Sequence, residues 1–432
     1  MNTILKNKAY LYLICLFLGI LTSFSLPPYN LVYINFLTFP TLLYILINHV
    51  DKKIISFLVG CIFGFGYFIS NLYWITNSLT FDENFKFIIP FALILIPTFL
   101  GIFYGLVTFL CNFFNLKNKI SSILIFSIFF GIIEFLRSFI FGGFPWNLIV
   151  FSFSNNLPYL QILSYIGTYS LNLLSITIFL LPITFFFHYK NSTRFIIFCF
   201  SLILLVINFL YGNLNIKNFE KKKYDNLDSV IRVVSPNIPI ERFLTNQNPE
   251  KNIDELLTLS DPSKDEKKIF IFPEGIITSI YFKDLKFFKS IFKKKFNINH
   301  KIVLGISSLK ENKIYNSLVV LSNETELLYK YNKNKLVPFG EFLPLEKYLN
   351  KFGLKKITHG YKSFSSSTER NILSVGEISF LPLICYEIIF SGALTENADN
   401  YDFILNISED GWFGNSIGPI QHFSHSIFRS IE

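Results

Sequence analysis

Charged residues are scarce in this sequence and make up only 16% of its 432 positions. Hydrophobic residues make up 51%, phenylalanine alone occurs 53 times, and the mean hydropathy is +0.44. A soluble enzyme of this length rarely has such a composition, which argues against a wholly water-soluble protein. The charged residues lie mostly in the second half, which indicates a membrane half followed by a water-soluble half. The net charge of +9 therefore says little about nucleic acid as a partner. The lysines there could contact anionic lipid headgroups, although a solvated surface is the simpler interpretation.

Signatures of metal and nucleotide binding are also missing. The six histidines are scattered, and His422 and His425 have no further ligand-type residues at a metal-site spacing. The sequence contains neither a Walker A motif nor GxGxxG. These residues therefore give no indication of a metal or nucleotide site.

Long apolar runs fill the first half of the chain, and a spanning helix needs about 20 such residues. Seven runs qualify: 9–26, 31–48, 54–76, 87–115, 119–140, 162–187 and 194–211. The first could be a signal peptide, but "SFSLPPYN" follows it in place of a small-residue cleavage site, so we expect a retained helix.

Basic residues indicate the orientation, because they accumulate in cytoplasmic loops. They precede the first run and follow the second, fourth and sixth, as Lys6, Lys8, Lys52, Lys53, Lys117, Lys119, Lys190 and Arg194. The intervening loops have few, so we expect a cytoplasmic N-terminus. Seven crossings then give a multi-pass membrane domain over 1–211 and place the domain over 212–432 on the outer side of the membrane. For the inner membrane of a bacterium, that side is the periplasm.

Two features of the membrane half are polar or interrupted. Glu134 and Arg137 lie three residues apart on one helix face, so we expect them to pair within the bundle. The segment "FGGFPWNLIVFSF", residues 141–153, either lines a cavity or is a surface loop with Trp146 in the aromatic belt.

The second half alternates short apolar runs with polar helical stretches, which indicates a layered α/β domain. Helices are expected near 249–260 and 280–294, and strands at 230–238, 268–275, 301–309, 316–323, 378–387 and 401–408. Ligands bind at the carboxyl ends of strands in such sheets. Glu274 and Cys385 both lie at such ends.

Cys385 could be a small core residue, half of a disulfide or a nucleophile. The other four cysteines, Cys15, Cys61, Cys111 and Cys199, all lie in expected membrane spans, so they offer no disulfide partner. A nucleophilic thiol needs a base, and acyl transfer needs a cation or N–H donors for its oxyanion.

Glutamates and lysines supply candidates for these roles. Glu274 follows a buried strand in "IFIFPEGI", although a solvated loop glutamate would look the same. The segment "YKYNKNKLVPFGEFLPLE", residues 329–346, places Lys333, Lys335 and Glu341 near a turn, or is a charged surface strand. Glu387 follows Cys385 by two residues and would share its face if the strand continued.

These motifs resemble the nitrilase, or carbon-nitrogen hydrolase, superfamily, whose sites use glutamate, lysine and cysteine in that chain order. The membrane spans narrow the resemblance to the apolipoprotein N-acyltransferase family over essentially the whole chain. Motifs similar to those of the family are "SPNIP" (235–239), "FPEG" (272–275), "YNKNKLVPFGEFLP" (331–344), "ICYE" (384–387), "GWFG" (411–414), "PPYN", "YW" (73–74) and "PWNLIVFS" (145–152). The resemblance implies a polytopic α-helical membrane domain followed by a nitrilase-like α-β-β-α sandwich.

The resemblance also implies roles for individual residues. Glu274 would be the general base, Lys333 the oxyanion-stabilising cation and Cys385 the nucleophile. Lys333 is chosen over Lys335 because the family's lysine is the third residue of YxKxxLVPFGE. Supporting or substrate-binding positions would be Glu341, Tyr386, Glu387 and, on a loop over the cleft, Trp412.

The implied reaction takes an acyl chain from a phospholipid, with phosphatidylethanolamine expected, onto Cys385 as a thioester. The chain then passes to the α-amino group of diacylglyceryl-cysteine in an apolipoprotein. The resemblance implies no metal and no cofactor. We expect the protein to act as a monomer. The open alternatives are a membrane-anchored nitrilase-type amidase that uses water and an inactive homologue that binds lipid or lipoprotein.

Two positions depart from the family pattern. Members have a tryptophan soon after "NIP", whereas this chain has Phe243 at a nearby spacing. Members also continue beyond the point that corresponds to Glu432, so the C-terminal domain is expected to be truncated.

Overall fold

The computed structural model describes residues 7–116, 120–187, 190–222, 229–240, 248–262, 267–344, 363–392, 394 and 401–432. The chain divides into two compact units. The first comprises Met1–Lys223, Ile389–Gly392 and Phe413–Glu432. The second comprises Tyr224–Ile388 and Ala393–Trp412.

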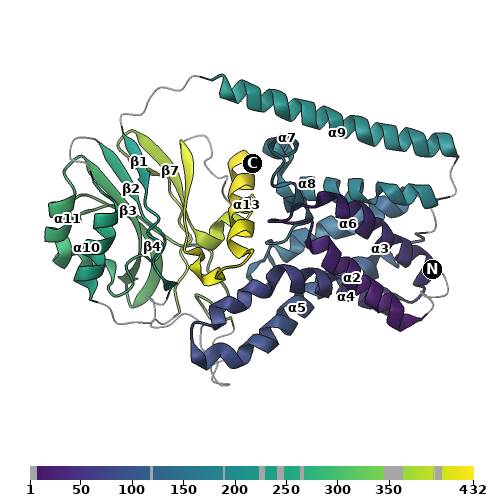
Figure 1. Ribbon diagram of the computed structural model, residues 1–432, viewed down its shortest axis with the longest axis horizontal. Coiled ribbons are helices and arrows are strands. Elements are labelled where there is room, and N and C mark those ends of the chain that lie inside the picture. The colour runs from purple at the N-terminus through teal and green to yellow at the C-terminus, as the bar shows by residue number, and fades with distance from the viewer. Residues whose placement is uncertain are drawn as a thin grey trace. The chain divides into compact units, whose positions relative to one another are not determined.

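The first unit is helical (Figure 1). Its α-helices are α2 (Lys8–Ser23), α3 (Asn35–His49), α4 (Lys53–Leu72), α5 (Ile89–Cys111), α6 (Ile120–Arg137), α7 (Leu157–Leu160), α8 (Leu163–Leu180), α9 (Asn191–Glu220) and α13 (Gly418–Ile431). Short 3-10 segments join several of them, at Val32–Ile34, Tyr73–Leu79, Glu83–Ile88, Ile140–Gly142, Ile149–Phe153 and Leu181–Phe186. Helices suit these apolar runs because a helix satisfies its backbone hydrogen bonds within itself.

Six helical segments among the described residues are long and apolar enough to cross a membrane. They are Val32–His49, Lys53–Leu79, Glu83–Cys111, Ile120–Arg137, Leu163–Phe186 and Ser192–Glu220. These segments correspond to six of the seven predicted runs. The remaining predicted run, 9–26, corresponds to α2, which is apolar but has only 16 residues. The helix ends at Ser23, ahead of Pro27 and Pro28, which cannot donate helical hydrogen bonds.

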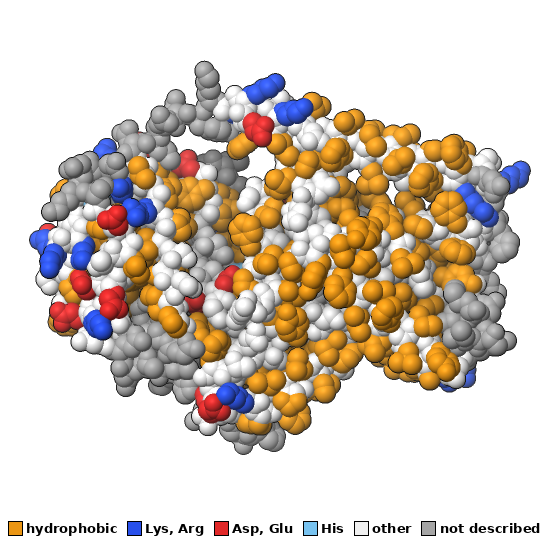
Figure 2. Space-filling view, viewed as in Figure 1, with side chains coloured by type: hydrophobic (Ala, Val, Ile, Leu, Met, Phe, Trp, Pro, Cys, Tyr) orange, Lys and Arg blue, Asp and Glu red, His pale blue; other side chains and the backbone are white. Residues whose placement is uncertain are grey.

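Hydrophobic side chains cover much of the visible surface of these helices (Figure 2). On α9, for example, Phe195, Phe200 and Ile207 are each more than half exposed. In water such a surface would be unfavourable by about 25 cal/mol per Å², whereas lipid tails are as apolar as the side chains. The surface therefore agrees with the membrane domain that the sequence predicts.

Close approach between helices depends on glycine. On α4 and α5, Gly60 faces the backbone of Tyr104, and Gly64 faces Gly101, so closely that a Cβ at either glycine would collide with it. Small residues four apart, such as Gly60 and Gly64, are a common way for membrane helices to approach each other.

Two predictions for polar and interrupted parts of this unit can be compared with the structure. The expected pair of Glu134 and Arg137 is confirmed: both are buried and joined by an ion pair, and Arg137 also donates to the carbonyl of Phe144. Trp146 is only 3% exposed, so placing it in an aromatic belt on a surface loop is wrong. Its indole stacks with the ring of His422, and its Nε1 donates to Gln421 on α13.

Helix α13 packs in this unit through a polar and aromatic face. The Gln421 amide oxygen accepts from Trp74 and Trp146, and its nitrogen donates to Asn71 and to the carbonyl of Pro27. These four bonds satisfy the buried amide of Gln421, which would otherwise be costly to bury.

The second unit contains two sheets (Figure 1). The five-stranded sheet has the order β1 (Val230–Val233), β2 (Lys268–Ile271), β3 (His300–Lys310), β4 (Lys313–Leu321), β5 (Leu327–Asn332). Its first three strands are parallel, and β4 is antiparallel to both neighbours. In the other sheet, β7 (Ile378–Ile384) lies between β6 (Leu373–Val375), which is antiparallel to it, and β8 (Phe403–Ile407), which is parallel.

Three layers form around two apolar clusters. One face of the larger sheet packs on α10 (Pro249–Leu259) and on α11 (Lys289–Lys295), through residues such as Leu257 and Phe292. The opposite face packs on the smaller sheet, where Val303 and Val320 share a cluster with Ile384. This helix, sheet, sheet order agrees with the predicted α/β fold class.

Strand bounds differ in places from the prediction. Strand β1 ends at Val233, short of residue 238, and the helical stretch at 280–294 is the 3-10 helix Phe282–Phe288 followed by α11. Strand β6 was not predicted, and β5 overlaps the segment 329–346, for which a charged surface strand was one of two interpretations. Strands β3 and β4 form a hairpin whose two loop residues, Glu311 and Asn312, both have positive φ, as the favoured two-residue turn requires.

Candidate active site

Four strand ends supply the candidate site. Glu274 lies in the turn after β2, Lys333 directly follows β5, and Cys385 directly follows β7. Residues 408–410 follow β8. All of them belong to the second unit. The arrangement matches the general tendency of α/β sheets to bind ligands at the carboxyl ends of their strands.

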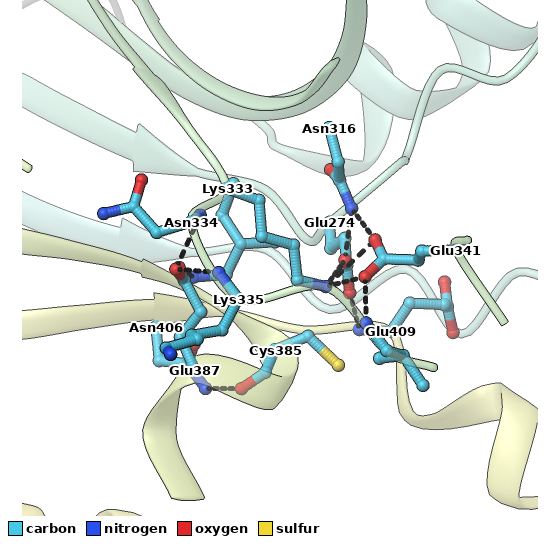
Figure 3. A network of polar contacts seen from close by, with 12 residues as sticks. Glu274, Asn316, Lys333, Asn334, Lys335, Glu341, Cys385, Glu387, Asn406 and Glu409 are labelled. Carbon is cyan, nitrogen blue, oxygen red and sulfur yellow. Dashed lines mark hydrogen bonds and ion pairs between the residues drawn. The ribbon is translucent and has the colours of Figure 1, made fainter. Parts of the chain in front are cut away.

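Lys333 lies between two carboxylates. Its Nζ is 3.0 Å from Oε1 of Glu274 and 3.1 Å from Oε2 of Glu341, and its side chain is 1% exposed. The Asn316 amide donates to both carboxylates, at 2.7 Å and 2.8 Å (Figure 3). Burial alone lowers the pKa of Lys333, but the two carboxylates outweigh this effect and hold the pKa well above its usual value. Lys333 is therefore a fixed ammonium group.

The backbone around Glu274 depends on the glycine in β3. Gly305 donates to the carbonyl of Pro273 and accepts from the amide of Ile276. A Cβ at Gly305 would lie 2.5 Å from the Cα of Glu274, which is too close for any side chain. The second oxygen of Glu274 accepts from the amide of Glu409 at 3.2 Å. The Glu274 carboxylate is thus held by Asn316 on β4, by Lys333 after β5 and by Glu409 after β8.

Cys385 sits where the chain turns sharply after β7. Its φ is +50°, a left-handed conformation that is unusual for a side chain other than glycine and is enriched at functional sites. Burial, and then the Glu274 carboxylate, raise the pKa of Cys385 well above its usual value, whereas the Lys333 ammonium lowers it. The thiol is therefore protonated at neutral pH, and it needs a proton acceptor during attack.

The prediction that Cys385 and Glu387 share a strand face is wrong. Strand β7 ends at Ile384, and a 3-10 helix covers Cys385–Ile389. The buried carboxylate of Glu387 accepts hydrogen bonds from the amides of Ile384, Asn334 and Lys335, from the Tyr331 hydroxyl and from the Arg370 guanidinium. Glu387 thereby joins the loop that carries Lys333 to the end of β7, directly before Cys385.

The other residues that the sequence predicted for the site are Lys335, Glu341, Tyr386 and Trp412, and only some of them lie in the network around Lys333. The Lys335 amide donates to Glu387, while Lys333 makes the contacts to Glu274 (Figure 3). Glu341 accepts from Lys333 and from the Val337 amide, so the structure places it within the network. Tyr386 is buried, and Trp412 is half-buried in the 3-10 helix Asp410–Phe413. Phe243 lies outside the described residues.

Sequence reasoning missed several residues of this network. They are Gly305, Asn316, Tyr331, Arg370 and the segment 408–410. Gly305 had a usable signal, because glycine inside a strand often marks a close backbone approach. Asn316 is a buried amide in a strand, and such a group needs partners, but the sequence does not say which ones.

Comparisons with known proteins cover nearly the whole chain. Residues 18–181 match the family model of the apolipoprotein N-acyltransferase N-terminal domain, and residues 233–432 match that of carbon-nitrogen hydrolase. The apolipoprotein N-acyltransferase of Rickettsia typhi is 31% identical over 435 residues, which are 97% of this chain and 84% of that protein. The chain belongs to the apolipoprotein N-acyltransferase family. The Brucella melitensis member is 28% identical over 96% of this chain and 81% of its own length.

Family membership confirms the resemblance found in the sequence, and the carbon-nitrogen hydrolase match confirms the predicted fold class. As an apolipoprotein N-acyltransferase family member with six apolar helices among its described residues, the chain is a multi-pass membrane acyltransferase. Among solved structures, an amidase from Nesterenkonia sp. is 14% identical, over 44% of this chain and 70% of its own, with a TM-score of 0.28. That similarity is too weak to bear on the site.

Proposed function

We propose that the protein acylates the N-terminus of lipoproteins in a bacterial inner membrane, by way of a thioester on Cys385. The acyl donor is a phospholipid, with phosphatidylethanolamine as the expected species, and the acceptor is the α-amino group of diacylglyceryl-cysteine. Residues 1–211 form the membrane domain. Residues 212–432 form the catalytic domain, on the periplasmic side. The protein acts as a monomer.

In the first half-reaction Glu274 takes the proton of the Cys385 thiol while the sulfur attacks the ester carbonyl carbon of the phospholipid. The negative charge that develops on the carbonyl oxygen is stabilised by the Lys333 ammonium. The carbon–oxygen bond to glycerol then breaks. Glu274 returns the proton to the glycerol oxygen, and the lysophospholipid leaves.

In the second half-reaction the α-amino nitrogen attacks the thioester carbonyl carbon. Glu274 accepts a proton from the nitrogen, and Lys333 again stabilises the oxyanion. The carbon–sulfur bond breaks, and the proton passes to the Cys385 thiolate. The thioester supplies the free energy for amide formation, so water has to be kept away while it persists.

One observation supports this proposal above the others: a buried ammonium contacts a buried carboxylate, and both interact electrostatically with the one cysteine in the second unit. Base, cation and nucleophile are the three groups that acyl transfer requires. The Glu387 network and Gly305 hold these groups at fixed positions, which catalysis also requires.

A product assay tests the proposal. Purified full-length protein is mixed with fluorescent phosphatidylethanolamine and a synthetic diacylglyceryl-cysteine peptide. We expect the label to appear on the peptide as an amide, in equal amount to the lysophospholipid released. A parallel reaction contains a peptide whose α-amino group is acetylated, and it should yield no labelled amide. Release of labelled fatty acid from the first mixture without amide would show a hydrolase and contradict the proposal.

A further inference from the structure

A third carboxylate lies next to the nucleophile, outside the proposed triad. A carboxylate oxygen of Asp410 and Sγ of Cys385 lie within 4.8 Å of each other. Oδ1 of Asp410 accepts a hydrogen bond of 2.5 Å from the Ser408 hydroxyl. Asp410 begins the 3-10 helix that follows β8, and its side chain is half-buried, so it can reach a bound substrate.

Asp410 does not favour the first half-reaction. Its negative charge raises the pKa of Cys385, as burial and Glu274 also do, and so it opposes formation of the thiolate. A role for Asp410 therefore has to lie in the second half-reaction. Glu274 and Glu341 both form ion pairs with Lys333. Oδ1 of Asp410 accepts a hydrogen bond from the Ser408 hydroxyl.

The second half-reaction brings a positive charge to this place. An α-amino group is largely an ammonium group at neutral pH, since its unperturbed pKa is about 8. To attack, its nitrogen has to come within about 3 to 3.5 Å of the thioester carbon, which is bonded to Sγ. The nitrogen is then about 4 to 5 Å from Sγ. The Asp410 carboxylate lies within 4.8 Å of the same sulfur atom.

We infer that Asp410, held by Ser408, binds the α-ammonium group of the lipoprotein acceptor and presents it to the thioester on Cys385. This inference rests on the proposed function and names a specificity-determining residue for its second step. A charge-assisted hydrogen bond from the ammonium to Asp410 orients the nitrogen. The ammonium releases one proton to solvent and a second to Glu274. The carbon–nitrogen bond forms, the carbon–sulfur bond breaks, and Glu274 passes its proton to the Cys385 thiolate.

The experiment separates the two half-reactions in Asp410→Asn. Full-length protein is first loaded with fluorescent phosphatidylethanolamine, and thioester formation is timed. The loaded protein then receives either the diacylglyceryl-cysteine peptide or hydroxylamine, a nucleophile that is uncharged at pH 7. Ser408→Ala is a second variant, which leaves the carboxylate but removes its hydroxyl partner. Asp402→Asn is the matched control, because Asp402 binds Ser379 at the start of β7, far along the strand from Cys385.

We expect Asp410→Asn to form the thioester at least as fast as the unsubstituted protein and to react normally with hydroxylamine. Transfer to the peptide should fall about 10- to 100-fold, the effect of losing one hydrogen bond to a charged group. Ser408→Ala should show a smaller fall in transfer to the peptide. Its thioester should also form more slowly, because the Ser408 hydroxyl hydrogen-bonds Cys385 and lowers the pKa of the thiol. In Asp410→Asn, equal losses with peptide and hydroxylamine, slow thioester formation, or unchanged transfer to the peptide would each overturn the inference alone. Absence of any thioester in the unsubstituted protein would overturn the proposed function as well.

Discussion

Replacing Cys385 with alanine is expected to abolish acyl transfer, with a loss of about 10⁴-fold or more, as removal of a catalytic nucleophile usually causes. No neighbouring group can replace the sulfur, because the other four cysteines lie on α2, α4, α5 and α9 of the first unit. The fold should be little affected. Alanine is no larger than cysteine, and Glu387 keeps its hydrogen bond from the Ile384 amide. The measurement is transfer of a fluorescent acyl chain to the peptide, together with a thermal unfolding curve.

Cys199→Ala is the matched control for this variant, since it removes a thiol from α9 and should leave transfer unchanged. Substantial transfer by Cys385→Ala would show that Cys385 is not the nucleophile. If the variant instead loses its cooperative unfolding transition, Cys385→Ser offers a second test, because a hydroxyl retains the shape of the thiol but is a poorer nucleophile.

Lys333→Met is expected to reduce transfer by about 10²- to 10³-fold through loss of the oxyanion-stabilising charge. It should also lower the free energy of unfolding by about 3–5 kcal/mol, because Glu274 and Glu341 would remain buried without their cation. The pKa of Lys333 is raised in the folded chain. Its stabilising effect is therefore present at neutral pH and is lost as the pH rises through the folded-state pKa. Unfolding and transfer are measured on the same preparation.

Lys330→Met is the control, because Lys330 lies on the same strand, β5, but its side chain is exposed. It should change neither transfer nor stability appreciably. Full activity in Lys333→Met would contradict the role proposed for the ammonium. Lys333→Arg keeps the charge but not the compact shape of the group, and it should recover stability better than activity.

The sequence predicted three of the four strands that carry the candidate site, at 268–275, 378–387 and 401–408, because each is a short apolar run followed by a polar residue. It could not predict how the site residues face each other. The side chains of Cys385 and Glu387 were expected on one face because strands alternate, but the chain leaves the strand at Cys385 with a positive φ. Positive φ in a residue other than glycine depends on tertiary contacts, which a pattern of residue types does not contain.

The helical unit shows a similar limit. Apolar length predicted six of the spanning segments, and the three-residue spacing of Glu134 and Arg137 predicted their ion pair. It did not predict that Gln421, late in the chain, receives hydrogen bonds from both Trp74 and Trp146. Contacts between residues hundreds of positions apart leave no periodicity in the sequence, and Trp146 was therefore also open to interpretation as a surface residue.

Capture of the acyl-enzyme tests the central claim most directly. Full-length protein is incubated with phosphatidylethanolamine and no acceptor, digested under acidic conditions, and analysed by peptide mass spectrometry. We predict one acyl chain on the peptide that contains Cys385, removed by hydroxylamine at neutral pH and absent from Cys385→Ala. An acyl chain found on another residue, or acyl transfer to the peptide acceptor without any adduct on Cys385, would contradict the account.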